Sequence, residues 1–570
     1  MEKKKNNYLQ PVFVIGLSLL FTFIMFYVIK SAMTTEDVNI YSNTAEKYYY
    51  EGKYEESIAE YEKMKQEDEW PIWLVKEAQV YSIKGDLNKS ISILKEAVLI
   101  RNKLIEQDSK KYIDKDSEFM NEVVLTFYMN EEYDQAISLG NDYLVNKNST
   151  YKPLIKTMFS IYAGTGKENL AKKMIEAYPV DEKSAYDLAV VAEMEMVLKH
   201  YDDGFILLKQ AYDIDKNEMK VIDVVRENAL SNKDSVIKKL NQLIEKYPDQ
   251  GIYKLWLAEA YVTNGESNDN VINIINSDNT DMFGELSLDV VKATYYINEG
   301  NKKYSEQYIN KLINNEESKY IGYYLQGKEY YNREDYDKAL LSAKKSIIAN
   351  REFSQVYGSL IPDILLQKSE KDSILPYYFE AYINAPYNFN VIMNIGDYYK
   401  NTALNLDLAE NYYNEALNLN PISDELEYDL GLISYEKGDI DEAIYKINKA
   451  IQINDSKVQY YRTLGKIYLE NEDYENAIDN IRKAYNLDEN DILTLNNAGC
   501  YYIISKDNIW RGYENLKAAY EEMPDNLDKD KVRAITKNYK EAKRIYDLSL
   551  AAEENGEIID YDIPNFELFN

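Results

Sequence analysis

Histidine and cysteine are almost missing from this chain of 570 residues, which has one of each, His200 and Cys500. One cysteine cannot form a disulfide within the chain, and a zinc site of Cys/His type needs about four such ligands. A catalytic Cys–His pair would have to join two residues 300 positions apart. We therefore expect no catalytic residue, no metal and no cofactor, and we interpret His200 as a residue of a helix–helix turn.

Positive charge is also scarce: 66 Lys and Arg stand against 98 Asp and Glu, a net charge of −32. A nucleic-acid binder needs a net basic face, so this balance excludes that class and favours partners of basic character. Proline (11) and glycine (21) are rare as well, which is typical of a chain made mostly of helices. Tyrosine is abundant instead, with 56 residues.

The segment "YAGTGKENLAKKM" (Tyr162–Met174) resembles a phosphate-binding loop at first sight. That loop needs Gly, four residues, then Gly-Lys-Ser/Thr, but here Glu168 follows Gly166-Lys167. The apolar residues before and after the glycines recur at helical spacing. The sequence therefore predicts a turn between two amphipathic helices, with Gly166 at the turn and Ala171 at a close helix contact.

Two further local patterns have weak functional interpretations. "DIDKNE" (Asp213–Glu218) begins like a calcium loop but lacks Gly at its sixth position and Glu at its twelfth. A basic cluster follows residue 528, and we interpret it as a solvated helix face, or as a surface that docks on an acidic partner or on this protein's own acidic body. The cluster consists of Lys529, Lys531, Arg533, Lys537, Lys540, Lys543 and Arg544.

A run of 19 uncharged residues, 11–29, follows a short segment with Lys3, Lys4 and Lys5. As a helix it would be about 28 Å long, close to the thickness of the hydrocarbon core of a membrane. It is either a transmembrane anchor or a signal sequence, and we favour the anchor because the run is long and a cut after Ala32 would place Lys30 at a position that needs a small residue. The lysine bias predicts a cytoplasmic segment 1–10, the anchor at 11–29, and a repeat domain outside the cell.

A period of 34 residues is the strongest feature of the sequence. Gly431, Gly465 and Gly499 are each 34 residues apart, and Ala443 and Ala477 repeat with them. Related segments begin at residues 45, 80, 127 and 329, with Ser57, Ser90, Ala136 and Ala339 in the place of Ala443. Such a period predicts stacked helical hairpins that bury their apolar faces only against their neighbours.

This pattern of early Leu-Gly, central Tyr, two later Ala and a final Pro resembles the tetratricopeptide repeat (TPR). The resemblance covers residues 43–524 and is weaker between 185 and 317. It implies an all-α fold, a right-handed α-solenoid of helical hairpins preceded by one transmembrane helix, of a bacterial membrane-anchored type. Residues 101–118 are expected to be an inserted linker.

The expected organisation follows from the repeats. A linker at 30–42 precedes N-terminal repeats at 43–262, a degenerate repeat or hinge at 263–285, and C-terminal repeats at 286–527. A capping helix at 528–552 covers the last repeat, because Val532, Ile535, Tyr539, Ala542 and Ile545 form one apolar stripe. The acidic segment 553–570 is expected to be loosely ordered.

The resemblance implies a scaffold that binds proteins or peptides in its concave groove and assists assembly of a membrane or cell-surface complex. In this family the first helix of each repeat lines the groove. Carried onto this sequence, the groove residues are Asn390, Met393, Asn394, Asp397, Tyr428, Asp429, Leu432, Gln459, Arg462, Thr463, Lys466, Leu493, Asn496 and Asn497. Among them, Arg462 and Lys466 are expected to receive an acidic side chain or a carboxylate. The alternative is an enzyme or regulatory domain within residues 185–317.

Overall fold

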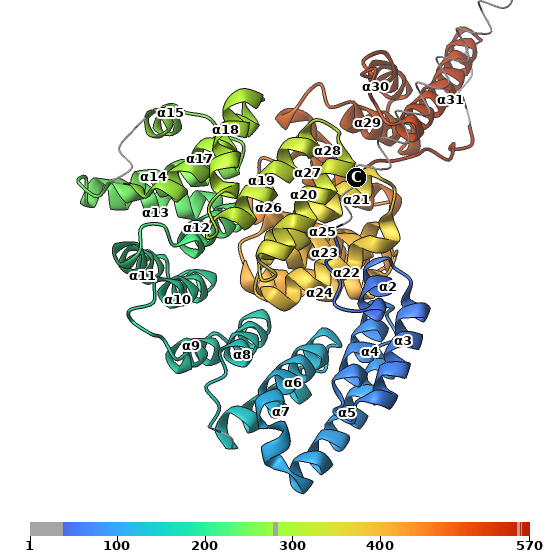
Figure 1. The fold of residues 1–570 in the computed structure, drawn as a ribbon. Coiled ribbons are helices and arrows are strands. Elements are labelled where there is room, and N and C mark those ends of the chain that lie inside the picture. The colour runs from blue at the N-terminus through green and yellow to red at the C-terminus, as the bar shows by residue number, and fades with distance from the viewer. Residues whose placement is uncertain (1–37, 147, 277–282, 556–558, 560) are drawn as a thin grey trace, which may run out of the picture. The chain divides into compact units, whose positions relative to one another are not determined.

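The computed structural model describes residues 38–146, 148–276, 283–555, 559 and 561–570 (Figure 1). This part of the chain has 29 α-helices and no β-strand, which confirms the all-helical prediction. The predicted membrane span 11–29 lies outside the described residues. None of the described helices combines the length and the apolar character needed to cross a membrane.

The chain divides into two compact units. Unit 1 contains residues 38–161 and 170–391, and unit 2 contains residues 162–169 and 392–570. The division falls at residues 391–392. For residues 263–285 the sequence suggested a degenerate repeat or a hinge. Within that segment the structure describes helix α15 (Asp269–Ile275), whose Val271 and Ile274 are buried. Helix α15 packs against its neighbours in unit 1.

Unit 1 is built mainly from helices that pair with the next helix along the chain. They are α2 (Thr44–Tyr50), α3 (Tyr54–Glu67), α4 (Ile72–Ile83), α5 (Leu87–Gln107), α6 (Ser109–Met129), α7 (Tyr133–Asn146), α8 (Lys152–Gly164), α9 (Glu168–Ala177), α10 (Ala185–Val197), α11 (Tyr201–Ile214), α12 (Met219–Ser231), α13 (Lys233–Lys246), α14 (Gly251–Thr263), α15, α17 (Glu285–Asn298), α18 (Lys302–Ile313), α19 (Lys319–Asn332), α20 (Tyr336–Ala349), the π-helical turn η1 (Val356–Leu360), α21 (Ile361–Gln367), the short turn η2 (Lys371–Ser373) and α22 (Ile374–Asn384).

Unit 2 continues the same architecture and ends with a longer helix. Its helices are α23 (Phe389–Asn401), α24 (Leu406–Leu419), α25 (Asp424–Glu436), α26 (Ile440–Ile453), α27 (Val458–Glu470), α28 (Tyr474–Leu487), α29 (Ile492–Ile504), α30 (Ile509–Glu521) and α31 (Lys529–Glu554). Helix α31 packs against α29 and α30.

Small residues set the close approach of the two helices in a repeat. Ser57, Ser90 and Ala136 are fully buried, as are Ala339, Ala443 and Ala477. A Cβ atom added to Gly431 would lie 2.7 Å from Cγ1 of Ile447 on the partner helix, and the same holds for Gly465 and Ile481. These contacts confirm the structural role predicted for the repeated Gly and Ala.

The turns within the hairpins use a left-handed backbone conformation. Gly166, between α8 and α9, has φ +68°, which confirms that this glycine forms a turn between helices. Gly438 occupies the corresponding place between α25 and α26 with φ +85°. Between α27 and α28 the same conformation falls on Glu472 (φ 60°), where a side chain makes it less favourable.

The expectation of an inserted linker at residues 101–118 is wrong. Helix α5 continues to Gln107 and α6 begins at Ser109, so the two helices of neighbouring repeats are each 21 residues long. A buried ion pair fixes this extension, because Nε of Arg101 donates to Oδ1 of Asp116 at 2.7 Å. The polar residues that suggested a linker therefore lie on solvated faces of these two helices, apart from this pair.

Residues near the end of unit 1 pack against residues near its beginning. The ring of Tyr50 on α2 lies 4.7 Å from that of Tyr377 on α22, and Arg351 donates to the carbonyl oxygen of Ile40. Figure 1 shows α22 beside α2. After α22, Tyr387 reaches Glu193 on α10, with its hydroxyl 2.8 Å from Oε2. Residues far along the chain thus pack on the first helices of successive repeats.

Candidate peptide-binding groove

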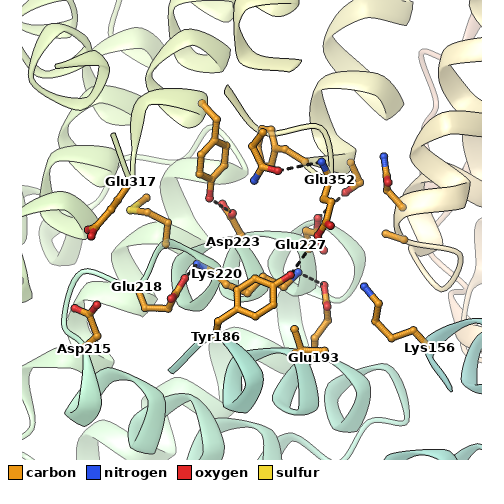
Figure 2. Close-up of a pocket in the computed structure, with 18 of the residues that line it drawn as sticks. Lys156, Tyr186, Glu193, Asp215, Glu218, Lys220, Asp223, Glu227, Glu317 and Glu352 are labelled. Carbon is orange, nitrogen blue, oxygen red and sulfur yellow. Dashed lines mark hydrogen bonds and ion pairs between the residues drawn. The ribbon is translucent and has the colours of Figure 1, made fainter. Parts of the chain in front are cut away.

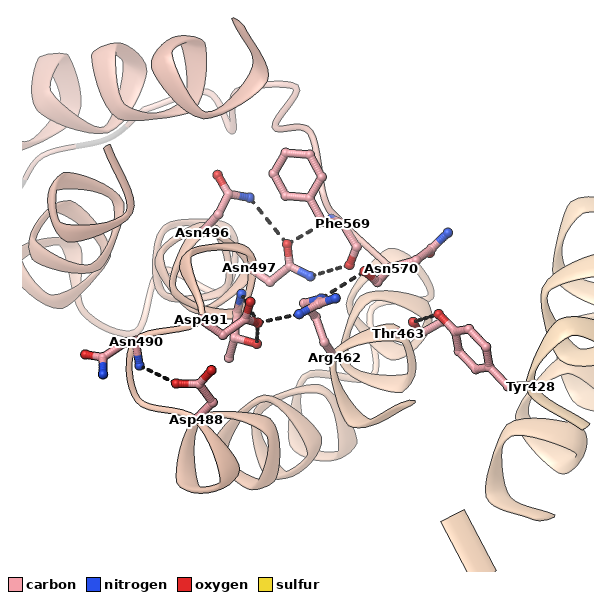
Figure 3. Close-up of polar contacts among 11 residues, drawn as sticks. Tyr428, Arg462, Thr463, Asp488, Asn490, Asp491, Asn496, Asn497, Phe569 and Asn570 are labelled. Carbon is pink, nitrogen blue, oxygen red and sulfur yellow. Dashed lines mark hydrogen bonds and ion pairs between the residues drawn. The ribbon is translucent and has the colours of Figure 1, made fainter. Parts of the chain in front are cut away.

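The first helices of the last two repeats, α27 and α29, and the capping helix α31 hold the last residues of the sequence (Figure 3). We call residues 561–570 the tail segment. It has no helix or strand, and it contacts these helices through both its backbone and its side chains. The sequence suggested a loosely ordered acidic segment, whereas these residues make specific contacts.

Asparagine side chains bind the backbone of the tail segment. Asn497 on α29 donates to the carbonyl oxygen of Phe569 at 2.7 Å and accepts from its N–H at 2.9 Å. Asn538 on α31 donates to the carbonyl oxygen of Glu567 at 2.8 Å and accepts from its N–H at 3.1 Å. An amide side chain offers both a donor and an acceptor, so it can replace one edge of a β-ladder. Residues 567 and 569 present the same edge because alternate residues of an extended chain do so.

These asparagines are completely buried, which makes the arrangement specific. Asn496, Asn497 and Asn538 have no exposed area. Asn496 also donates to the carbonyl oxygen of Glu567 at 3.0 Å, and Asn538 donates to Oδ1 of Asn496 at 2.9 Å. A buried amide without partners is costly, so the groove favours an occupant with an extended backbone at this place.

Positive charges line the end and the edge of the groove. Nε of Arg462 donates to the main-chain oxygen of Asn570 at 2.8 Å, and Nζ of Lys466 donates to its side-chain oxygen at 3.0 Å. Arg462 is itself fixed by an ion pair with Asp491. On α31, Lys537 pairs with Glu567 at 3.0 Å. The sequence expected Arg462 and Lys466 to receive an acidic group, and in this structure they receive oxygen atoms of the chain's own tail segment.

Apolar side chains of the tail segment enter the core of unit 2. Phe566 is buried in a cluster with Cys500, Ile503 and Leu516, and Leu568 packs beside it. Phe569 packs on the other side of α29, against the cluster that contains Leu495 and Ile535. The hydroxyl of Tyr561 donates to the carbonyl oxygen of Ile503 at 2.8 Å. The groove therefore selects side chains as well as an extended backbone.

The other predicted groove residues have other partners, except Leu493, which packs against the same cluster as Phe569. Asn390 belongs to unit 1, where it donates to Ser231 at 3.1 Å. Met393, Asn394 and Asp397 lie on α23, and Asp397 accepts from the hydroxyl of Tyr413. Tyr428 and Thr463 hydrogen bond to each other at 2.9 Å. Asp429 pairs with Lys400 at 2.7 Å. Leu432 packs against a buried cluster, and Gln459 is exposed. Leu493 packs against the cluster that also contacts Phe569.

Sequence reasoning missed Asn538, because the apolar stripe of α31 was interpreted only as the contact of a capping helix. One signal was available. Asn538 stands between Ile535 and Ala542 on the apolar stripe of this helix, where a polar residue needs a hydrogen-bonding partner. For Lys537, docking on the protein's own acidic residues was one of the stated interpretations of the basic cluster.

A second feature is a cavity of about 580 Å³ in unit 1 (Figure 2). Its lining includes Lys156 and Lys220, together with seven carboxylates: Glu193, Asp215, Glu218, Asp223, Glu227, Glu317 and Glu352. It lies partly within 185–317, where the sequence analysis placed its alternative function. Among the described residues, no group of His, Cys, Asp and Glu is arranged to hold a metal ion.

The cavity carboxylates perturb one another. Burial, and next the charge of Glu193, raise the pKa of Glu227 to about 8. Burial raises the pKa of Asp223 to about 6, although Arg226 opposes this. Lys220 outweighs the burial of Glu193 and lowers the pKa of that carboxyl. Glu193 and Glu227 thus differ in protonation near neutral pH.

The cavity network is largely satisfied by the chain itself. Lys220 donates to Glu193 at 3.0 Å, and Ser354 donates to Glu227 at 2.9 Å. Chemically, an excess of carboxylates attracts cationic groups and repels phosphates and other anions. The hydrogen bonds also tie α10 and α12 to the segment around α22, so the network holds unit 1 together.

Comparisons with known proteins agree with the repeat pattern. Two models described as tetratricopeptide repeat match residues 402–458 and 458–491. The chain therefore contains tetratricopeptide repeats in unit 2. A comparison with curated protein sequences finds no significant match.

Solved structures of helical-repeat proteins are similar to parts of this chain. The APC/C Cut9–Hcn1 structure matches at 16% identity over 87% of this chain and 95% of that one, with a TM-score of 0.39. PilF of Pseudomonas aeruginosa matches at 14% identity over 40% and 96%, with a TM-score of 0.33. YrrB, described as a TPR protein with an unusual peptide-binding site, matches at 18% identity over 32% and 93%, with a TM-score of 0.27. These TM-scores are too low to transfer a function.

Proposed function

We propose that this protein is a scaffold without catalytic activity whose unit 2 holds an extended segment of another protein. The observation that supports this most is the pair of buried asparagines, Asn497 and Asn538, each of which binds both backbone groups of one residue in the tail segment. Backbone recognition of this kind accepts any extended segment whose side chains fit the neighbouring apolar clusters.

The membrane anchor remains part of the proposal. Residues 11–29 would hold the protein in the membrane with the N-terminus in the cytoplasm and the repeats outside, where the scaffold would assist assembly of a membrane or cell-surface complex. The sequence also suggested basic partners, because the chain carries −32. That expectation applies to the acidic surface, since the groove itself presents Arg462, Lys466 and Lys537.

The test uses a fluorescent peptide with the sequence of residues 561–570 and the purified chain that lacks those ten residues. We expect saturable binding by fluorescence anisotropy and no chemical change in the peptide. Asn497→Ala removes two hydrogen bonds, each worth about 0.5–1.5 kcal/mol, and should weaken binding about tenfold. The matched control is Asn490→Ala, because Asn490 is exposed on the loop before α29. Absence of binding, or equal affinity in both variants, would refute the proposal.

A further inference from the structure

Both units bind a segment of their own chain, but they hold these segments in different ways. In unit 1, α22 is a helix with eight buried residues, among them Tyr377, Phe379 and Tyr382. In unit 2, only Phe566 of the ten tail residues is buried to that extent, and Asp562, Ile563, Asn565, Glu567 and Asn570 are exposed. Helix α22 is therefore part of the folded core of unit 1, while half of the tail residues are exposed at the surface of unit 2.

The helices under the tail segment also pack directly against one another. Leu516, Ala542 and Ile545 are fully buried and join α30 and α31, and Ile535 and Ala519 do the same beside Leu495. The tail segment adds Phe566, Leu568 and Phe569 to these clusters from outside. Loss of the tail segment would expose apolar surface and three buried asparagines, which is the chemistry of an open peptide site.

The contacts define the kind of segment that fits. Buried amides need an extended backbone at positions 567 and 569, the two apolar clusters need large side chains at 566, 568 and 569, and the polar end needs oxygen atoms opposite Arg462 and Lys466. Lys537 favours an acidic residue at position 567. The corresponding pattern is Phe-Glu-Leu-Phe-Asn, which is residues 566–570 of this chain.

We propose that the tail segment is a built-in competitor, and that the partner of this groove is a protein with an extended, acidic segment of the same Phe-acid-Leu-Phe-Asn pattern that must displace it. This inference rests on the proposed function. A tethered segment acts at an effective concentration on the order of millimolar, so a free segment of the same intrinsic affinity binds far more weakly to the intact chain. Weak ligands then cannot displace the tail segment. A partner can displace it if it binds more tightly or if its own local concentration is high.

The experiment compares the full chain with the chain that lacks residues 561–570, using the fluorescent peptide of residues 561–570 as probe. We expect the peptide to bind the shortened chain at least tenfold more tightly than the full chain. In the full chain, the double change Phe566→Ala, Phe569→Ala should release the tail segment and restore most of that affinity. Ile563→Ala is the matched control, since Ile563 is an exposed apolar residue of the same segment and should change nothing.

Each outcome has one interpretation. Equal affinity for the full and the shortened chain would overturn the competitor and leave the proposed function standing. Binding to neither chain would overturn both. A dimer of the full chain that disappears when residues 561–570 are removed would also overturn the proposal, because the tail segment would then occupy the groove of a second copy. Circular dichroism of all variants checks that the helices persist.

Discussion

At the scale of single residues, the most informative side chains are polar groups buried among apolar ones. Asn496, Asn497 and Asn538 have no exposed area, yet their amides bond to one another and to the backbone of the tail segment. In unit 1, Glu227 and Glu193 meet in a cavity beside Lys220. In both places the stability of the folded state depends on whether each buried polar group has a partner. An unpaired polar group in the interior costs free energy.

Asn538→Ala should loosen the tail segment without unfolding α31. The substitution removes the acceptor of the Glu567 N–H and a donor to its carbonyl oxygen. Two hydrogen bonds of about 1 kcal/mol each correspond to roughly 10–30-fold faster hydrogen exchange of the Glu567 and Phe569 amides. The control is Lys540→Ala, at an exposed position of the same helix. Unchanged exchange in Asn538→Ala would show that the amide does not hold the segment.

Glu227→Gln should make unit 1 less sensitive to alkaline pH. The folded protein raises the pKa of Glu227 from 4.5 to about 8, so it keeps a proton that the unfolded chain releases near pH 4.5. Stability from this group is complete below that pH and is lost as the pH rises through 8. Glutamine carries no charge to bury, so this variant should be more stable than the wild type by roughly 1–3 kcal/mol at pH 9 and similar to it at pH 5.

Thermal unfolding by circular dichroism at both pH values measures this difference. Glu317→Gln is the control, because Glu317 lines the same cavity but is exposed. A wild type that is equally or more stable than Glu227→Gln at pH 9 would contradict the raised pKa.

At the scale of the helical hairpin, glycine has two separate roles that substitutions can distinguish. Gly431 allows α25 to approach α26, and its added Cβ would meet Ile447 at 2.7 Å. Gly438 forms the turn between the same helices with φ +85°, and a Cβ there would meet nothing within 4 Å. The first role concerns packing, and the second concerns only the backbone.

Gly431→Ala should cost about 1–3 kcal/mol through overpacking, and Gly438→Ala about 1 kcal/mol through the left-handed conformation. Combined with Ile447→Ala, the cost of Gly431→Ala should shrink because the clash is removed, whereas the cost of Gly438→Ala should simply add. Urea unfolding of the single and double variants gives these coupling energies. Equal coupling for both glycines would mean that the two roles are not separable.

At the scale of the whole molecule, the main property is that each unit binds a segment of its own chain. Unit 1 holds α22 against α2 and the following Tyr387 against α10, and unit 2 holds the tail segment on α27, α29 and α31. The groove of unit 2 is therefore occupied, whereas the repeat pattern alone suggested an open groove. A partner therefore has to use the remaining surfaces or displace the more weakly held segment, which is the tail segment.

We predict that the repeat units lie outside the cell. The reason is the lysine bias, with Lys3, Lys4 and Lys5 just before the apolar run 11–29 and fewer basic residues after it. Protease added to intact cells stripped of wall should digest an epitope tag placed after Asn570. A cytoplasmic marker protein that stays intact is the control. A tag that is digested only after lysis would reverse the topology.

The sequence by itself determined the repeated hairpins. Gly431, Ala443, Gly465 and Ala477 meet partners within the same 34-residue period, so periodicity alone indicates their contacts. It also named Arg462, Asn496 and Asn497 on the first helices of well-matched repeats. These residues contact the tail segment, and their binding of a partner stays a prediction. The hairpin prediction succeeds because it depends on residues that are close together along the chain.

Only the tertiary structure decided what fills the grooves. Tyr50 meets Tyr377, Glu193 meets Tyr387, and Asn497 meets Phe569, all pairs that are far apart in sequence and outside any repeat period. The tail segment is held largely through its backbone. Every residue has the same backbone groups, so the composition of the segment does not predict this contact. Asn538 and the basic cluster around Lys537 were the visible signs in the sequence, but neither identifies residues 567 and 569 as the partners.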